Sequence, residues 1–371
     1  MKVVFWQSFL NPHQAPYIRT LAALPGWDVT VVAEQAMPEG REALGLSVPG
    51  LASARVFLAP DAGSVESLVA RSSPDTIHVL EGIRGGCTFT KTSLPLLIRR
   101  RARIGIVSES CDPRSFRGVL RRTLYLSLAA RYGADLDFVF AMGEQGVRWY
   151  RECGFPADRI FRFAYVTDRL CERIPRASEP GPTAEVTLAF TGQLIQRKGG
   201  DILLAALALV PDRTWRLIIT GEGSERSRWE GIAAQLHISD RVAFTGAISN
   251  ARALAVMASA DVLVLPSLFD GWGAVVNEAL MQGVPVLCSD HCGARDLVRE
   301  PWRGEVFKAG AVGSLRDVLA RWICRGKRSL ELTERIKSWS HCIEDESMAE
   351  YFTSLLRHIY KGERRPTSPW L

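Results

Sequence analysis

A short apolar strand followed by a glycine-rich turn and a helix, within residues 261–286, is the feature that most constrains the fold of this chain. Residues 261–266 (DVLVLP) form an apolar, β-branched run that is typical of a buried parallel strand. Gly271 and Gly273 permit a tight turn after it, and a helix is predicted from about residue 274 to 281. This order predicts one repeat of an α/β sheet.

Two acidic residues, Asp270 and Glu278, bracket the turn. Helical rise over eight steps corresponds to roughly 12 Å, comparable to the span from a hexose hydroxyl across a pyrophosphate to a ribose. Carboxylates accept paired hydrogen bonds from hydroxyls, and the free N–H groups that open a helix suit a pyrophosphate. We therefore expect Asp270 to hold a sugar and Glu278 a ribose diol. The turn and helix start are expected to supply donor contacts from Gly271, Trp272, Gly273, Ala274 and Val275.

The segment resembles the donor-site motif of retaining GT-B glycosyltransferases of the family-4 type (glycosyl transferases group 1), in which seven residues separate two Glu residues. Pro-Ser, Gly-x-Gly, Glu-Ala-Leu and Gly-x-Pro-Val elements occur here in the same order. The first acid is Asp270, one methylene shorter than the family's Glu. A solvated helix with two unrelated acids is the alternative.

A second strand, loop and helix is predicted within residues 186–210, with Gly192 opening the loop. The resemblance implies that Arg197 and Lys198 in this loop neutralise the phosphates of the donor. Such cations favour a transition state in which a diphosphate departs. The family often has Arg after the first loop glycine, where this chain has Gln193, so Arg197 is expected to carry more of the charge. An exposed basic loop is the alternative.

A third strand, residues 215–220, runs into a Gly-Glu-Gly loop that lacks the last glycine of a dinucleotide fingerprint. The resemblance implies that Gly221 borders the donor phosphates and that the backbone from Gly246 to Ile248 meets the nucleobase. Plain strand-to-helix turns explain these glycines nearly as well.

The 371-residue length fits two domains, and the segment at residues 174–185 (IPRASEPGPTAE) has the proline and glycine content of a linker. Strand-like runs alternate with helical runs on both sides of it, which predicts an α/β protein with two doubly wound, Rossmann-like domains facing across a cleft. The expected domains are an acceptor-binding domain at 1–177 and a nucleotide-sugar-binding domain at 184–340. By analogy with the resembling fold, a helix at about 344–361 packs back on the first domain.

Polar residues at predicted strand ends of the first domain are candidates for acceptor contacts. They are His13, His78, Glu81 and Glu109. The resembling family often has a His where this chain has Glu109. Loop caps or satisfied core residues are the alternative for all four.

Charge is concentrated between residues 91 and 131, where ten basic residues and two acidic ones occur. The basic residues alternate with apolar ones, a pattern that suits anionic lipid headgroups. A nucleic acid partner is disfavoured because no nucleic-acid-binding motif is present. A solvent-exposed Arg-rich helix without a binding role is the alternative.

The eight cysteines are scattered, with no zinc-type spacing, so neither a metal nor a cofactor is expected. Met1 and Lys2 lead directly into an apolar strand without the apolar region of a signal peptide, and no run of about 20 apolar residues occurs. We expect a cytoplasmic protein with a peripheral contact at the inner face of the cell membrane.

The resemblance implies retaining transfer of a sugar from a nucleotide diphosphate donor to a hydroxyl of a lipid-linked glycan or another envelope polysaccharide intermediate. Because no carboxylate pair with glycosidase spacing can be identified, no nucleophile is named. Three alternatives stay open: a nucleotide-sugar epimerase, a phosphorylase of the same two-domain plan, and a non-catalytic nucleotide-sugar-binding protein.

Overall fold

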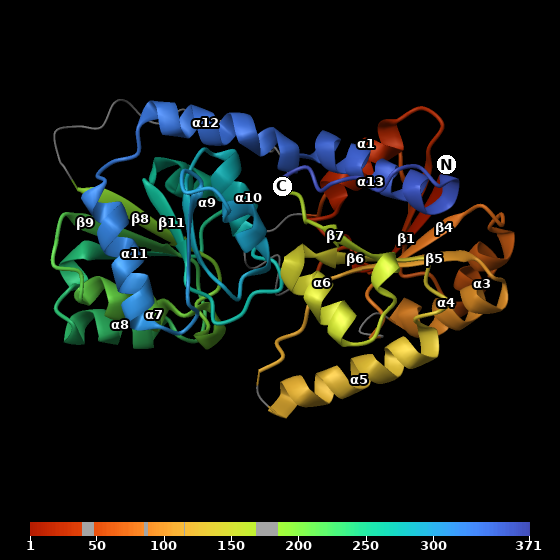
Figure 1. Cartoon of the computed structure of the whole chain (residues 1–371), viewed down its shortest axis with the longest axis horizontal. Helices are drawn as coiled ribbons and strands as arrows, with labels where there is room; N and C mark the ends of the chain where they lie inside the picture. Colours follow the sequence, from red (N-terminus) through yellow and green to blue (C-terminus); the bar gives the residue numbers. More distant parts are fainter. Residues whose placement is uncertain (39–47, 85–87, 115, 168–184) are drawn as a thin grey trace. The chain divides into compact units, whose positions relative to one another are not determined.

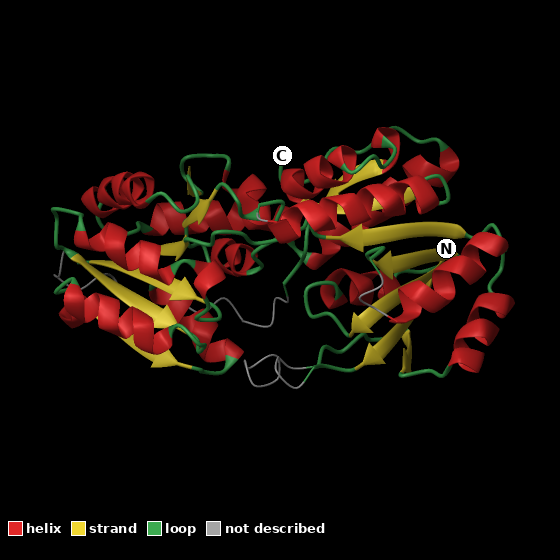
Figure 2. Cartoon of the chain, turned by 90° about the horizontal axis from the view of Figure 1, so that it is seen from below, coloured by secondary structure: helices red, strands yellow, loops and turns green. Residues whose placement is uncertain are grey.

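The computed structural model describes residues 1–38, 48–84, 88–114, 116–167 and 185–371. The chain forms two compact units, each built on a parallel sheet covered by helices on both faces (Figures 1 and 2). The N-terminal unit includes the described residues up to 167 together with 343–371, and the C-terminal unit includes residues 185–342. The predicted linker, apart from Glu185, lies outside the described residues.

The N-terminal sheet has seven strands in the order β3-β2-β1-β4-β5-β6-β7, and every described pairing is parallel. Its strands are β1 (Lys2–Phe9), β2 (Asp28–Gln35), β3 (Arg55–Leu58), β4 (Ile77–Glu81), β5 (Arg103–Ser108), β6 (Phe138–Met142) and β7 (Ile160–Phe163). Its helices are α1 (Ala15–Ala23), α3 (Ala62–Arg71), α4 (Thr88–Arg99), α5 (Phe116–Tyr132), α6 (Gly143–Glu152) and α13 (Asp345–Lys361).

The C-terminal sheet has six strands in the order β10-β9-β8-β11-β12-β13, also with parallel pairings. Its strands are β8 (Val186–Thr191), β9 (Trp215–Thr220), β10 (Val242–Gly246), β11 (Val262–Leu265), β12 (Val286–Ser289) and β13 (Gly304–Phe307). Its helices are α7 (Gly200–Ala208), α8 (Arg226–Gln235), α9 (Asn250–Ser259), α10 (Val275–Met281), α11 (Val312–Cys324) and α12 (Leu330–Ser340). The predicted α/β fold with two doubly wound sheets is therefore confirmed.

Helix α13, though last in the chain, belongs to the N-terminal unit and packs against α1 (Figure 1). Phe352 is fully buried in this helix and contacts the rings of Phe5, Tyr17 and Phe140, which come from β1, α1 and β6. Clustered rings bury large apolar areas and favour tilted and edge-to-face contacts. This aromatic core fixes α13 to its face of the sheet.

In each sheet, successive strands are added first toward one edge and then toward the other. The change of side falls between the parallel neighbours β1 and β4 in one unit and between β8 and β11 in the other. Loops that leave such a pair at its carboxyl end diverge to opposite faces and leave room for a ligand. Within the described residues, no helix combines the length and hydropathy needed to span a bilayer.

Candidate active site

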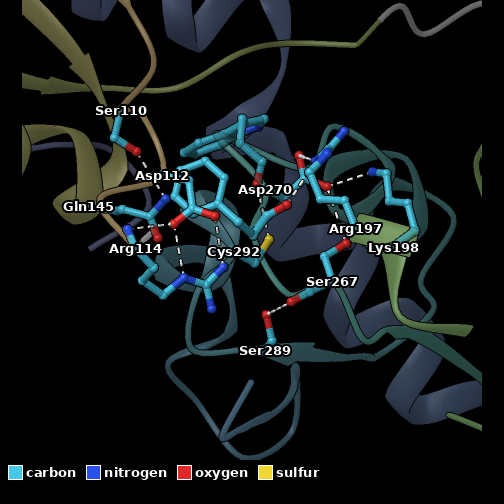
Figure 3. Close-up of polar contacts among 12 residues, drawn as sticks. Ser110, Asp112, Arg114, Gln145, Arg197, Lys198, Ser267, Asp270, Ser289 and Cys292 are labelled. Carbon is cyan, nitrogen blue, oxygen red and sulfur yellow. Dashed lines mark hydrogen bonds and ion pairs between the residues drawn. The ribbon is translucent and has the colours of Figure 1, made fainter. Parts of the chain in front are cut away.

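Three of the predicted donor-site side chains lie together at the carboxyl ends of β8 and β11 (Figure 3). Lys198 Nζ donates to Asp270 Oδ2 at 2.6 Å, and Arg197 Nη1 lies 3.7 Å from Asp270 Oδ1. Asp270 and Lys198 have side chains that are only 12% and 14% exposed, whereas that of Arg197 is 45% exposed. The ion pair therefore joins the two loops that flank the switch point of the C-terminal sheet.

Hydrogen bonds to backbone carbonyls hold the two loops together. Leu268 N–H donates to the Arg197 carbonyl at 2.8 Å, and the Arg197 guanidinium donates to the Phe269 carbonyl at 2.8 Å. Gly199 follows the loop in the left-handed region, at φ 67°, and a Cβ there would overlap the Pro266 carbonyl. Close approach of the two loops thus requires glycine at this position.

Asp270 is also fixed by the loop after β12. Its N–H donates to the His291 carbonyl at 2.9 Å, and its carbonyl accepts from Gly293 N–H at 3.1 Å. Ser267, a residue that sequence reasoning missed, is fully buried, and its hydroxyl donates to Asp270 Oδ2 at 3.4 Å. The carboxylate therefore has a defined orientation before any ligand arrives.

The turn and helix after β11 form as predicted, with α10 starting at Val275, one residue later than expected. Ala274 caps the helix without a side-chain hydrogen bond, and Val276 N–H donates to the Gly273 carbonyl at 2.9 Å. Gly271 is buried, and Gly273 has a φ of 94°. Trp272 is 1% exposed and its indole N–H donates to Asn277 at 2.8 Å, so its side chain belongs to the core and a ligand would meet only its backbone.

Glu278 lies on α10, one turn after the helix start, and is partly buried. Burial raises the pKa of this carboxyl from 4.5 to about 7. No hydrogen bond or ion pair from the described residues joins its carboxylate to the cluster of Arg197, Lys198 and Asp270. A carboxylate in this state gains most from a ligand that donates hydrogen bonds to it.

Three glycines predicted to border the donor end adjacent strands of the same sheet, β8, β9 and β10. Gly192, Gly221 and Gly246 have φ values of 151°, 134° and 74°, where side chains are rarely accommodated. Gly221 N–H donates to the Gly246 carbonyl at 3.0 Å, and Gly192 N–H donates to the Thr220 carbonyl at 3.0 Å. The glycines allow the three loops to pack closely at the carboxyl end of the sheet. Gln193 is exposed and Ile248 is partly exposed beside them.

Gly221→Ala is expected to lower the free energy of unfolding by about 3 kcal/mol, because a Cβ there would overlap the Gly192 carbonyl in a backbone conformation that alanine disfavours. The matched control is Gly231→Ala on α8, where nothing lies within 4 Å of an added Cβ. Alanine there removes backbone freedom of the unfolded chain and should stabilise by up to about 1 kcal/mol. Urea unfolding of both variants checks this, and equal midpoints would contradict the packing argument.

In the N-terminal unit, Glu81 lies at the corresponding switch point. Its carboxylate accepts from the N–H and the hydroxyl of Ser8 at 2.8 and 2.6 Å and from Asn11 at 3.2 Å. The His13 carbonyl accepts from Val166 N–H at 3.0 Å, and the His13 ring centroid lies 5.9 Å from that of Tyr165. Burial raises the pKa of Tyr165, and Glu109 and Glu81 raise it further, which places both carboxylates near this ring.

His78 does not join this group. It is 1% exposed in the middle of β4, where its Nδ1 accepts from the Trp6 indole at 3.2 Å, and burial lowers its pKa to about 4. The acceptor role that its position near a strand end suggested does not fit this location. A neutral core histidine is the interpretation that fits.

Among the described residues, no group of three or more His, Cys, Asp or Glu side chains lies together as a metal site would require. Cys288 and Cys292 are both fully buried, and the Cys292 thiol donates to the Trp272 carbonyl at 3.0 Å. This hydrogen bond ties the loop after β12 to the glycine turn.

Residues 173–339 match the family model described as Glycosyl transferases group 1. This segment contains all of β8 to β13 and every donor-site candidate. The C-terminal unit is thus similar to group 1 glycosyltransferases over the whole of its sheet.

Several similar proteins are named as glycosyltransferases. The 2-deoxystreptamine glucosyltransferase of Streptomyces kanamyceticus is 30% identical over 156 residues, which cover 42% of this chain and 39% of that protein. The D-inositol 3-phosphate glycosyltransferase of Nocardia farcinica is 32% identical over 196 residues, covering 48% of this chain and 42% of the relative. The GDP-mannose-dependent alpha-(1-6)-phosphatidylinositol monomannoside mannosyltransferase of Mycobacterium tuberculosis is 28% identical over 236 residues, covering 60% of each. The chain thus spans less than two thirds of these relatives.

Solved structures extend the likeness to the whole fold. Anabaena Alr3699/HepE in complex with UDP superposes with a TM-score of 0.72 at 16% identity, covering 96% of this chain and 99% of that one. The apo form of the lipopolysaccharide outer core galactosyltransferase WaaB also gives a TM-score of 0.72 at 16% identity, covering 98% and 100%. These neighbours identify the two-domain fold as GT-B.

Proposed function

We propose that the chain is a retaining glycosyltransferase of the family-4 type that moves a sugar from a nucleotide diphosphate sugar to a hydroxyl of an acceptor. The observation that carries this proposal is the Lys198–Asp270 ion pair, with Arg197 beside it, at the switch point of a group 1 glycosyltransferase domain. An anionic donor needs cations there, and a sugar needs a fixed carboxylate. The cluster offers both within one hydrogen-bonded unit.

Both cations keep bonding capacity for the donor. The Lys198 ammonium uses one of three N–H groups on Asp270, and the Arg197 guanidinium uses one of five on the Phe269 carbonyl. The remaining donors neutralise the diphosphate as the glycosidic bond breaks, and contributions of this kind are typically worth 10²–10³ in rate. Asp270 accepts from sugar hydroxyls, and Glu278 accepts from the ribose diol. Backbone around Gly192, Gly221 and Gly246 borders the phosphates and the base.

Transfer with retention proceeds by a front-face route in which the departing phosphate takes the proton of the acceptor hydroxyl. The protein then has to supply charge stabilisation and positioning, and a protein nucleophile is not needed. Arg197 and Lys198 provide the positive charge, so no metal is required. UDP and UDP-glucose, found in complexes of Anabaena HepE, support the choice of a nucleotide donor.

The acceptor we propose is a lipid-linked glycan or another envelope polysaccharide intermediate. The names of two similar proteins, a phosphatidylinositol monomannoside mannosyltransferase and a lipopolysaccharide galactosyltransferase, support this choice. In the N-terminal unit, Glu81, His13 and Glu109 are the residues proposed to contact the acceptor. Their carboxylates and ring suit sugar hydroxyls.

A donor panel tests the proposal. The protein is incubated with UDP, GDP, ADP and CMP sugars, with and without membrane extract, in buffer with EDTA, and nucleotide release is measured. Release that depends on the extract supports the transferase. Epimerised donor without an acceptor would indicate an epimerase, dependence on free phosphate would indicate a phosphorylase, and binding without release under any condition would indicate a nucleotide-sugar-binding protein. Any of these last three results would overturn the proposal.

A further inference from the structure

Helix α5 presents a second apolar face, directed away from the core of its unit. Within α5, the buried residues are Gly118, Tyr125 and Ala129, which share one side of the helix. The exposed large apolar side chains are Phe116 (78%), Val119 (60%), Leu120 (54%), Leu126 (45%) and Leu124 (44%). Figure 1 shows α5 at the periphery of the N-terminal unit. A helix that is apolar on both sides and exposed on one has a surface suited to a second partner.

Phe116, Leu120 and Leu124 recur every four residues, so they line the outward side of the helix opposite the buried residues. Leu126 and Val119 lie at one flank of this line. We call these five residues the outer face of α5. Their exposure leaves apolar surface in contact with water, which is unfavourable unless it is covered in use.

Arginines border the outer face, and no acidic residue occurs in α5. The four basic residues of the helix are Arg117, Arg121, Arg122 and Arg131. Arg122 forms an exposed ion pair with Glu152 at 3.7 Å, and such a pair is weak. The helix thus combines an apolar line with flanking positive charge.

The other basic cluster of this region, residues 99–103, is partly engaged inside the unit. Arg100 donates to the Ala70 carbonyl at 2.9 Å. Arg103 pairs with Asp75 at 2.6 Å and lies over the ring of Tyr360 at 4.7 Å. Part of the charge excess of residues 91–131 is therefore engaged within the unit, whereas α5 combines its charge with an exposed apolar face.

We propose that the outer face of α5 inserts into the headgroup region of an anionic lipid bilayer. Arginines at the flanks meet lipid phosphates, and the apolar line enters the boundary with the acyl chains. The helix lies flat on the surface, because it is too short and too charged to cross. A second copy of the chain fits less well, since a twofold contact would bring four arginines of one α5 against four of the other. A nucleic acid would leave the five apolar side chains in water.

This inference goes beyond the proposed function, because vesicle binding requires neither donor nor turnover. The test is flotation of the full chain with vesicles of phosphatidylcholine alone and with 30 mol% phosphatidylglycerol, at low and high salt. The wild type is expected to float with the anionic vesicles and to be released by salt. Phe116→Ser with Leu120→Ser and Leu124→Ser should lower the partition coefficient at least tenfold, as should Arg117→Gln with Arg131→Gln.

Control variants remove exposed side chains of the same kinds from the C-terminal unit. Leu209→Ser with Leu330→Ser removes two comparably exposed leucines of the C-terminal unit, and Arg316→Gln with Arg325→Gln removes two exposed arginines there. Both controls should float like the wild type. Absence of wild-type binding, or unchanged binding of the α5 variants, would overturn the proposal. So would a dimer in light scattering that the serine variant dissociates, because the face would then be a self-association surface.

Discussion

Glu278→Gln is expected to weaken donor binding at least tenfold while making the folded protein more stable. In the proposed function the carboxylate accepts two hydroxyl hydrogen bonds from a ribose diol, and an amide offers one acceptor atom in its place. Calorimetric titration with the sugar nucleotide that gives turnover measures the loss. Glu350→Gln, on the exposed side of α13, is the control and should bind donor normally.

The stability gain follows from the raised pKa of Glu278. In the unfolded chain the carboxyl ionises near 4.5, and in the folded chain near 7. Between these values the folded state holds the extra proton, so the free energy of unfolding falls as pH rises through this window and is flat above it. Glutamine does not ionise, so the variant should exceed the wild type by about 1 to 3 kcal/mol at pH 8 and match it near pH 4.5.

Donor affinity has the opposite pH dependence. If the ionised Glu278 binds the ribose as proposed, affinity of the wild type should rise as pH increases through about 7 and then level off. The glutamine variant should bind with little change over the same range. Unchanged donor affinity in the variant, or a loss of stability at pH 8, would contradict the ribose role.

Lys198→Ala is expected to lower turnover at saturating donor by about a hundredfold or more, with a smaller effect on donor binding. The ammonium is the most buried cation of the cluster, and charge on the departing diphosphate is greatest in the transition state. Lys198→Arg should retain part of the rate because it keeps the charge. Initial rates of nucleoside diphosphate release, compared with donor affinity, separate the two effects.

The control for Lys198→Ala is Arg316→Gln, which removes an exposed cation of α11 in the same unit. Its turnover should equal that of the wild type. Since Lys198→Ala also leaves Asp270 without its nearest partner, unfolding is measured in parallel. A variant that is folded and fully active would show that Lys198 serves the Asp270 loop alone.

Much of the fold could be predicted because parallel strands buried on both faces are continuous apolar runs. Residues 261–266 were expected as a strand, and the structure has β11 there. Strand β3 was not predicted because its four residues are all exposed at the sheet edge. Strand β7, also four residues, follows a short 3₁₀ turn and has no distinctive pattern.

The candidate site was predictable in part, because side chains after neighbouring parallel strands share one edge of a sheet. That argument brings Arg197, Lys198 and Asp270 together, although 72 residues separate Lys198 from Asp270. It does not reveal Ser267 or Ser8, whose roles depend on rotamers and on partners distant in the chain. It also misplaced His78, because only the packing of Trp6 against β4 shows that this ring is buried.

The most direct measurement is a crystal structure of the protein soaked with the sugar nucleotide selected by the donor panel. The account predicts diphosphate oxygens within hydrogen-bond distance of Lys198 Nζ and the Arg197 guanidinium, and ribose oxygens on the Glu278 carboxylate. A nucleotide bound elsewhere, with these three side chains free of it, would contradict the account.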